Sequence, residues 1–187
     1  MNTKETSADK TKYRLAEAAK KCMAASGTDA MTVTQIVQTC GVTRQTFYRN
    51  FQDKYDLVHW VFDKILMQSF AHMGEGKTVY EALVNKFTYI QQELIFFQAA
   101  FRCDTQNSLR EHDFRLIQAF YADRITRICP LSDTLRFQLE MYCQGSVYMT
   151  VKWLMEGAQL TPSQLARQLC DAMPAELEKT FRRLELK

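Results

Sequence analysis

The sequence predicts an all-α protein. Its 187 residues include only 6 Gly and 3 Pro, too few for a turn-rich β protein, and long segments are rich in the helix formers Ala, Leu, Gln, Glu, Lys and Arg. Within those segments apolar residues recur at intervals of three and four, which is the spacing of one face of a helix. Hydrophobic residues make up 47% and charged residues 24%, an ordinary balance for a soluble globular chain with a core.

The first predicted helix follows a short polar segment. Residues 1–8 are expected to form a flexible arm, and the helix is expected from about Asp9 to Ser26. Gly27 then ends it, because glycine is a poor helix former. The apolar residues of this helix share one face: Leu15, Ala18, Ala19, Cys22 and Met23.

The second and third predicted helices are joined by a tight turn. Thr32 and Gln35 have the spacing of a capping box for the second helix. Gly41 suits the turn, since a positive φ angle costs little without a Cβ atom. Thr43 can cap a third helix that runs to about Asn50.

A fourth helix and a larger C-terminal part complete the predicted architecture. Residues 9–55 are expected to form a three-helix domain with a helix-turn-helix at 32–51, and a linking helix capped by Asp53 is expected to continue to about residue 73. The segment His72–Lys77 contains Gly74 and Gly76 and is the best candidate for the boundary between the N-terminal domain and the rest of the chain. Residues 77–187 would then form a larger helical C-terminal domain, with helices at Val79–Ala100, about 108–128, Ser132–Glu156, after Thr161 with Pro162 and Gln164 in its first turn, and Ala175–Leu186.

Positive charge is concentrated in the N-terminal part. The formal net charge of the chain is +3, and residues 1–55 hold nine Lys/Arg against five Asp/Glu, so 9 − 5 = +4. The remaining residues hold fifteen against sixteen, so 15 − 16 = −1. This distribution is what a region that binds phosphate requires.

The third predicted helix has an apolar and a polar face. Val42, Phe47 and Phe51 fall where they can anchor it to the preceding helices. The other face is polar and aromatic, as expected of a helix that enters the major groove of DNA. The residues predicted to contact DNA are Thr32, Thr34, Thr43, Arg44, Gln45, Thr46, Tyr48, Arg49, Asn50 and Lys54.

These side chains suit different parts of DNA. Arg44 can bind guanine through two hydrogen bonds, and Gln45 can bind adenine in the same way. Thr46 and Tyr48 can contact thymine methyl groups or phosphate oxygens. Phosphate is the expected partner of the others: Arg49, Asn50 and Lys54, and also Thr32 and Thr34 at the start of the second helix.

The run GVTRQTFYRNFQDKYDL (Gly41–Leu57) resembles the signature of the TetR family of bacterial transcriptional regulators. Asn50 departs from that signature, which usually has His or Tyr there. The resemblance implies a three-helix DNA-binding domain on a larger helical domain that forms a homodimer and usually binds a small effector. A shorter run, WLMEGAQLTPSQLA (Trp153–Ala166), is similar to the subgroup that includes regulators of dihydroxyacetone kinase operons. That similarity implies control by a protein partner, or activation in place of repression.

The sequence of the C-terminal part predicts a hydrophobic core and a dimer interface, but it does not define a ligand-binding site. Its dense aromatic residues either line an apolar effector pocket or simply form the core. Polar residues near predicted helix ends could orient a ligand or lie in solvated loops: Arg102, Asp104, His112 and Arg115. The small residues Gly145 and Ser146 with Thr150 would let two helices approach closely, so Ser132–Cys170 is the candidate homodimer interface. Two copies would bind a palindromic operator.

Other classes of protein are disfavoured. The sequence has no Gly-rich phosphate loop, no H-E-x-x-H motif and no nucleophile elbow, so an enzyme, a cofactor and a metal are not expected. The six Cys form no C-x-x-C pair and fit a reducing cytoplasm. No apolar run approaches the length of a membrane span. The sequence therefore predicts a cytoplasmic transcriptional regulator, with a dimeric repressor under a small effector preferred over an activator under a protein partner or a helical interaction module that does not bind DNA.

Overall fold

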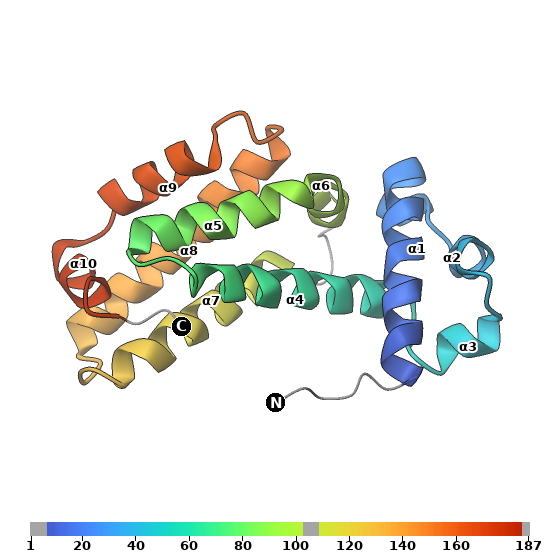
Figure 1. Cartoon of the computed structure of the whole chain (residues 1–187), viewed down its shortest axis with the longest axis horizontal. Helices are drawn as coiled ribbons and strands as arrows, with labels where there is room; N and C mark the ends of the chain where they lie inside the picture. Colours follow the sequence, from blue (N-terminus) through green and yellow to red (C-terminus); the bar gives the residue numbers. More distant parts are fainter. Residues whose placement is uncertain (1–6, 103–108, 185–187) are drawn as a thin grey trace. The chain divides into compact units, whose positions relative to one another are not determined.

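The computed structural model of the chain describes residues 7–102 and 109–184. Most of the predicted arm and the ligand candidate Asp104 therefore lie outside the described residues. Every regular element in the described part is a helix, as the sequence predicts (Figure 1). The helices are α1 (Ser7–Ala30), α2 (Val33–Cys40), α3 (Arg44–Tyr48), α4 (Lys54–Met73), α5 (Val79–Gln92), α6 (Leu94–Arg102), α7 (Leu109–Thr126), α8 (Asp133–Met155), α9 (Pro162–Asp171) and α10 (Ala175–Phe181).

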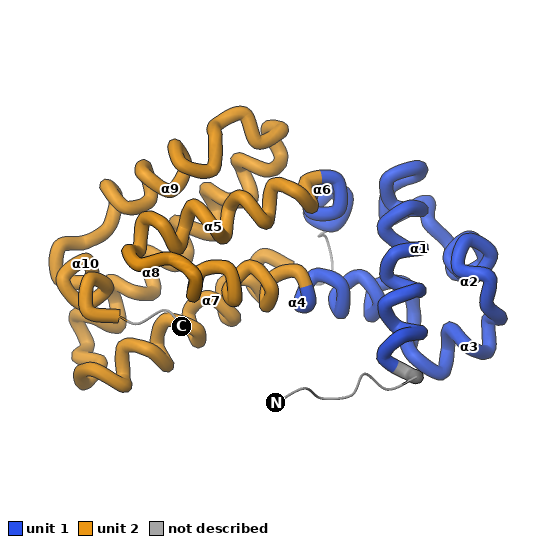
Figure 2. The backbone as a smooth tube through the Cα atoms, in the orientation of Figure 1, with its two compact units in different colours: residues 1–64, 95–103 blue, residues 65–94, 104–187 orange. Residues whose placement is uncertain are grey.

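The chain packs as two compact units, coloured separately in Figure 2. Unit 1 contains Met1–Lys64 and Ile95–Cys103, and unit 2 contains Ile65–Leu94 and Asp104–Lys187. By packing, the division falls inside α4 and again at the start of α6. The boundary that the sequence suggested at His72–Lys77 lies inside unit 2.

Unit 1 holds the predicted helix-turn-helix together with α6. Gly27 interrupts α1 with φ 75° and ψ 168°, where the sequence predicted the helix to end, and one further turn continues to Ala30. In that turn the buried hydroxyl of Thr28 donates a hydrogen bond of 2.9 Å to the carbonyl oxygen of Ala99 in α6. Phe62 of α4 packs edge-on against Phe97 with ring centroids 5.7 Å apart, so α6 contributes to the core of this unit.

The segment predicted as one helix, Val79–Ala100, is two helices. The break is at Glu93, whose φ −101° and ψ 21° end α5 before α6 begins. Neither Gly nor Pro marks this position, and Gln, Glu and Leu around it favour helix. The α6 sequence LIFFQAAFR buries five of its nine residues. Residues from Ile95 onward pack in unit 1, whereas α5 packs in unit 2, so tertiary packing interrupts the helix at Glu93 despite the local preference for helix.

Unit 2 is a bundle in which α5 packs against α9 and α7 packs against α8. Its helix starts are as predicted: Thr161 and Gln164 form a capping box, with Pro162 in the first turn of α9. Aromatic rings fill the core, including Phe87 against Trp153 at 5.9 Å. The Trp153 indole N–H donates to the Leu160 carbonyl oxygen at 2.9 Å, which satisfies its buried polar group.

Two buried charged residues lie in the core of unit 2. Lys86 of α5 and Asp113 of α7 are each 5% exposed. Burial raises the pKa of Asp113 to about 6 and lowers the pKa of Lys86, and the attraction between the two charges opposes both shifts. The Lys86 ammonium also lies over the rings of Phe70 and Phe87, at 5.3 and 5.8 Å from their centroids. These contacts partly compensate the cost of burying the charge.

Candidate nucleic-acid interface

The N-terminus of α2 is fixed by a complete capping box. The backbone N–H of Gln35 donates to the Thr32 hydroxyl at 3.2 Å, and the Thr32 N–H donates to the Gln35 side-chain oxygen at 2.8 Å. Ile36 and Val37 are buried and hold the inner face of α2. Gly41 ends the helix in the left-handed region with φ 70° and ψ 38°, which confirms the predicted turn.

The position of α3 is set by its cap and two phenylalanines. The Thr43 hydroxyl accepts a hydrogen bond of 3.1 Å from the Thr46 N–H. Phe47 is fully buried and lies 6.0 Å from the Phe51 ring, which is itself buried. Val42 is only half-buried, so the two rings do most of the anchoring. Regular helix spans Arg44–Tyr48, which is shorter than the predicted extent to about Asn50.

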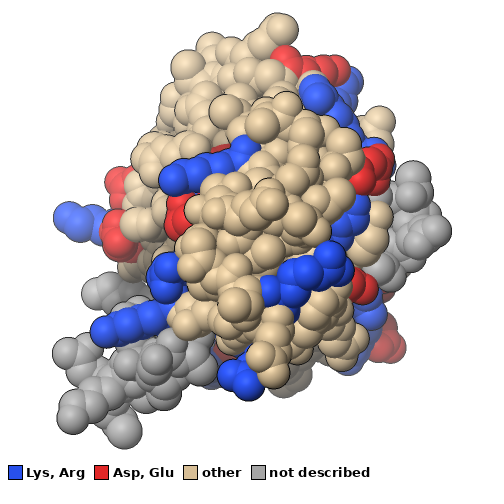
Figure 3. All heavy atoms as spheres, turned by 90° about the vertical axis from the view of Figure 1, so that its right-hand side faces the viewer, with Lys and Arg blue, Asp and Glu red and all other residues tan. Residues whose placement is uncertain are grey.

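The outer face of α3 is exposed and carries no negative charge. Arg44, Gln45, Tyr48 and Arg49 are all exposed, and Tyr48 has 51% of its surface in solvent. Residues 32–51 contain two Arg and no Asp or Glu. Figure 3 views this side of the molecule and shows Lys and Arg across it, with Asp and Glu toward its edges. The exposed Tyr48 ring and the two cations give this face groups that can contact both the bases and the phosphates of DNA.

Arg44 connects the two helices of the motif. Its guanidinium donates to the Thr34 hydroxyl at 3.1 Å and to the Tyr48 hydroxyl at 3.3 Å, and it lies 5.9 Å from the centre of the Tyr48 ring. Because all three side chains are exposed, water or a base edge can replace these bonds at small cost. The network therefore holds Arg44 and Tyr48 in position and still leaves them available to DNA.

Three of the predicted DNA contacts are half-buried: Thr46, Asn50 and Lys54. The Thr46 and Thr43 hydroxyls share a hydrogen bond of 3.0 Å. The Asn50 amide donates to the Thr46 carbonyl oxygen at 2.8 Å. These two side chains thus also stabilise the ends of α3, a role that their spacing did not indicate.

Lys54 is held by three backbone carbonyl groups. Its ammonium donates to the carbonyl oxygens of Thr28, Asp29 and Met31 at 3.0, 2.7 and 3.0 Å. All three N–H groups are thus used within the chain, at the point where α1 ends. A phosphate contact from Lys54, as expected from the sequence, requires that one of these bonds be given up.

Arg14, to which the sequence patterns assign no role, belongs to the framework of the motif. Its guanidinium donates to the Cys40 carbonyl oxygen at 3.0 Å and so ties α1 to the last residue of α2. The bond joins positions 26 residues apart, and no short-range pattern in the sequence identifies it.

The described ligand candidates of the C-terminal part belong to different units. Arg102 is exposed in unit 1, whereas His112 and Arg115 belong to α7 in unit 2. The Arg115 side chain is exposed and lies 4.0 Å from Glu111. Among the described residues, no group of three or more His, Cys, Asp or Glu is arranged to hold a metal ion. None of the helices described combines the length and apolar character of a membrane span.

The same segments match known protein families. Residues 15–61 match the family described as "Bacterial regulatory proteins, tetR family", and residues 77–174 match "Transcriptional regulator C-terminal region". The chain belongs to the TetR family. It is therefore a transcriptional regulator with a helix-turn-helix and not an enzyme.

One curated relative is similar over part of the chain. It is the HTH-type dhaKLM operon transcriptional activator DhaS of Lactococcus lactis subsp. lactis (strain IL1403), which is 30% identical over 94 residues. The chain spans about half the length of this relative, 48% of each sequence being aligned. The subgroup resemblance at Trp153–Ala166 pointed to regulators of this kind.

Solved structures share the fold. The dihydroxyacetone kinase operon activator DhaS superposes with a TM-score of 0.67 at 20% identity, covering 90% of this chain and 97% of that one. A TetR-family regulator from Streptomyces coelicolor gives 0.66 at 14% identity, covering 98% and 89%. FadR from Bacillus subtilis, solved in complex with stearoyl-CoA, gives 0.61 at 18% identity, covering 87% and 97%.

Proposed function

We propose that the chain is a sequence-specific regulator that binds a palindromic operator as a homodimer and inserts α3 into the major groove. The observation that carries this proposal is the exposed edge formed by Arg44, Gln45 and Tyr48, held above a fully buried Phe47. A rigid apolar anchor beneath exposed polar side chains is what direct reading of bases requires.

The structure supports different roles for the ten predicted contacts. Arg44 and Gln45 read bases, and Tyr48 contacts a thymine methyl group or a phosphate. Arg49, with Thr32 and Thr34 at the N-terminus of α2, binds phosphate. The half-buried or capping residues position the motif and reach phosphate secondarily: Thr43, Thr46, Asn50 and Lys54.

An exposed apolar stripe on α8 supports the homodimer. Phe137, Met141 and Tyr148 are 64%, 58% and 66% exposed, and their spacing puts them on one helix face. Gly145 lies in the same stripe, and a Cβ atom there would meet nothing within 4 Å. Large apolar side chains flanking an open glycine suit close packing against a second helix. The second copy would cover this face, within the predicted interface Ser132–Cys170.

Selection of bound sequences from random DNA with the purified full-length chain tests the proposal. A palindromic motif is expected, with affinity that falls steeply as salt rises. Replacing Arg44 or Gln45 by Ala should weaken binding by about 1–3 kcal/mol per lost base contact and relax specificity at that position. Enrichment of no motif would refute operator binding and favour a helical interaction module.

The direction of regulation has two candidates. The family resemblance favours a repressor released by a small effector, whereas the DhaS relative is named as an activator. A reporter fused to the selected operator distinguishes them, because deletion of the regulator raises expression from a repressed promoter and lowers it from an activated one.

A further inference from the structure

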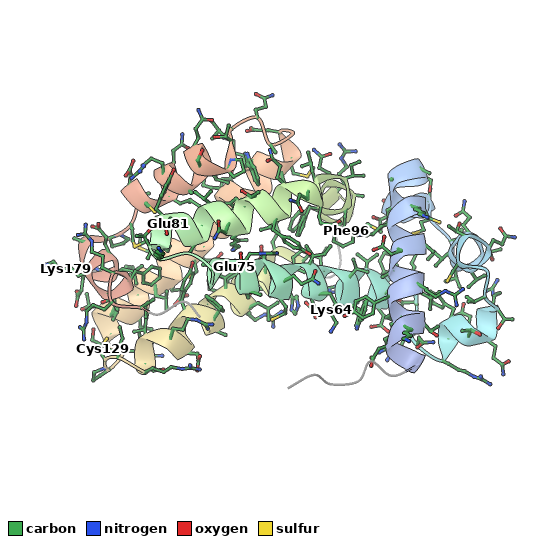
Figure 4. The ribbon with its side chains drawn as sticks, in the orientation of Figure 1. Lys64, Glu75, Glu81, Phe96, Cys129 and Lys179 are labelled. Carbon is green, nitrogen blue, oxygen red and sulfur yellow. The ribbon has the colours of Figure 1, made fainter. Side chains whose placement is uncertain are left out.

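A pocket of about 390 Å³ lies in unit 2 between the first turn of α5, the end of α9 and α10. In Figure 4 the labelled Glu81 marks the start of α5, and Lys179 marks α10. The loop before α5 is tightly packed here, since a Cβ atom on Gly76 would come within 2.4 Å of the Ala82 nitrogen. The wall made by Gly76 and Thr78 is therefore fixed by the backbone.

The floor of the pocket is apolar. Met173 and Phe181 are 9% and 1% exposed, and half-buried Val79 and Leu184 extend the apolar surface. The volume is at the lower end of the range of small-molecule sites, about 300–1,000 Å³. It therefore fits a ligand with a short apolar group.

The rim of the pocket is cationic. Lys77, Arg167 and Arg182 line it, against a single carboxylate, Glu178. Arg182 is neutralised by Glu178, with 2.5 Å between the guanidinium nitrogen and the carboxylate oxygen. The side chains of Lys77 and Arg167 form no ion pair or hydrogen bond with any other described residue. Neither of these two cations is therefore in an ion pair within the described part of the chain, although the Glu81 carboxylate lies near Lys77 and accepts a hydrogen bond of 2.8 Å from its backbone N–H.

Arg167 is also held in position to bind an anion. Its guanidinium stacks on the Tyr80 ring at 4.3 Å from the centroid. Stacking fixes the plane of the guanidinium and leaves its N–H groups at the edge, where a carboxylate or phosphate can accept two hydrogen bonds. An unpaired, oriented guanidinium beside an apolar floor selects a ligand with an anionic head and a short apolar body.

We propose that this pocket binds a small amphipathic anion, with its carboxylate or phosphate head on Arg167 and Lys77 and its apolar body on Met173 and Phe181. As a site of control it rests on the proposed function, because a ligand can alter operator affinity only in a chain that binds an operator. Carboxylate and phosphate heads share the required charge, and separate probes distinguish them.

Calorimetric titration of the full-length chain with octanoate and with octyl phosphate tests the site. At least one of the two is expected to bind saturably, and the tighter one identifies the preferred head. Octan-1-ol and inorganic phosphate each supply half of the ligand and should bind at least about tenfold more weakly. Failure of both anionic probes to bind, or equal affinity for octan-1-ol, would overturn the proposal.

Three variants and a control locate the binding. Arg167→Ala and Lys77→Gln should each weaken the tighter probe by about tenfold or more, the effect of a lost charge-assisted hydrogen bond. Cys170→Phe places a ring in the pocket and should abolish binding with all charges retained. Arg127→Ala removes an exposed guanidinium just after α7, outside the pocket, and should bind like the parent. Circular dichroism confirms that each variant is folded, and equal binding by Arg167→Ala and Arg127→Ala would refute the site.

Operator binding separates the two proposals. In the parent, the probe should change operator affinity, and in Arg167→Ala it should have no effect. A ligand-free parent that binds no operator would contradict the proposed function, while the calorimetric result would still decide whether the pocket binds the anion.

Discussion

Lys54 offers the sharpest test of how unit 1 is built. Its ammonium donates to three carbonyl oxygens at the end of α1, and the side chain is half-buried. Replacing it with Met keeps the length and apolar stem of the side chain but leaves three carbonyl groups without their donor. We therefore expect Lys54→Met to destabilise unit 1 whether or not DNA is present.

The expected loss follows from the three bonds. A hydrogen bond to a charged group contributes about 1.5–3 kcal/mol, but these three share one ammonium that water partly reaches, so about 2–4 kcal/mol in total is expected. The chain has two Trp, and Trp60 lies in unit 1 while Trp153 lies in unit 2. Urea unfolding followed by Trp60 fluorescence, in a common Trp153→Phe background, should show a midpoint lower by about 1–2 M.

The competing role makes the opposite prediction. If Lys54 only contacts phosphate, Lys54→Met should leave the urea midpoint unchanged. The slope of log affinity for the operator against log salt concentration should then become shallower by about 1. That result would refute the structural role. Lys21→Met is the matched control, because Lys21 is an exposed lysine of α1 in the same unit and should leave the midpoint unchanged.

Further predictions concern a cap, the dimer and a buried carboxyl group. Thr161→Ala should lower the unfolding free energy by about 1 kcal/mol and leave operator affinity unchanged, whereas Thr32→Ala should lower both, as urea unfolding and gel-shift titration would show. Phe137→Arg should shift the chain from dimer to monomer in sedimentation, because it puts a charge in the apolar stripe of α8. Since burial raises the pKa of Asp113 from 3.8 to about 6, the folded chain binds this proton more tightly than the unfolded chain. The unfolding free energy of the parent, relative to Asp113→Asn, should therefore fall by about 3 kcal/mol in total as pH rises from about 3 to 7 in urea titrations, with about 2 kcal/mol of the loss between about pH 4 and 6.

Helix starts could be predicted because their signals are local. Thr32 with Gln35 and Thr161 with Gln164 lie three residues apart, and both pairs form capping boxes. Gly41 was predictable for the same reason, since a backbone conformation identifies it without any distant partner. The break at Glu93 was not, because it depends on how α6 packs in unit 1 and not on the residues beside it.

The candidate interface divides in the same way. The exposure of Arg44, Gln45 and Tyr48 follows from helical spacing around a buried Phe47, so these residues could be singled out from sequence. The role of Lys54 depends on carbonyl groups 23 to 26 residues away in sequence. When only the neighbouring residues are considered, a lysine near a helix start suggests a contact with phosphate. In the fold, however, the Lys54 ammonium donates to backbone carbonyl groups.

The burial of Lys86 could be predicted from its position in the helical repeat, although its residue type suggests an exposed side chain. It lies among Leu83, Phe87 and Ile90 on the buried stripe of α5, and Asp113 lies in register with the buried residues of α7. A charged residue at a stripe position should therefore be expected in the core, and a second one of opposite sign on another helix is the partner that burial requires. Removing either alone leaves a buried charge uncompensated, which costs more than removing both. The two charges attract each other, although Asp113 Oδ1 is buried without a hydrogen-bond partner among the described residues. The helical period that identifies the apolar core thus identifies both residues as well.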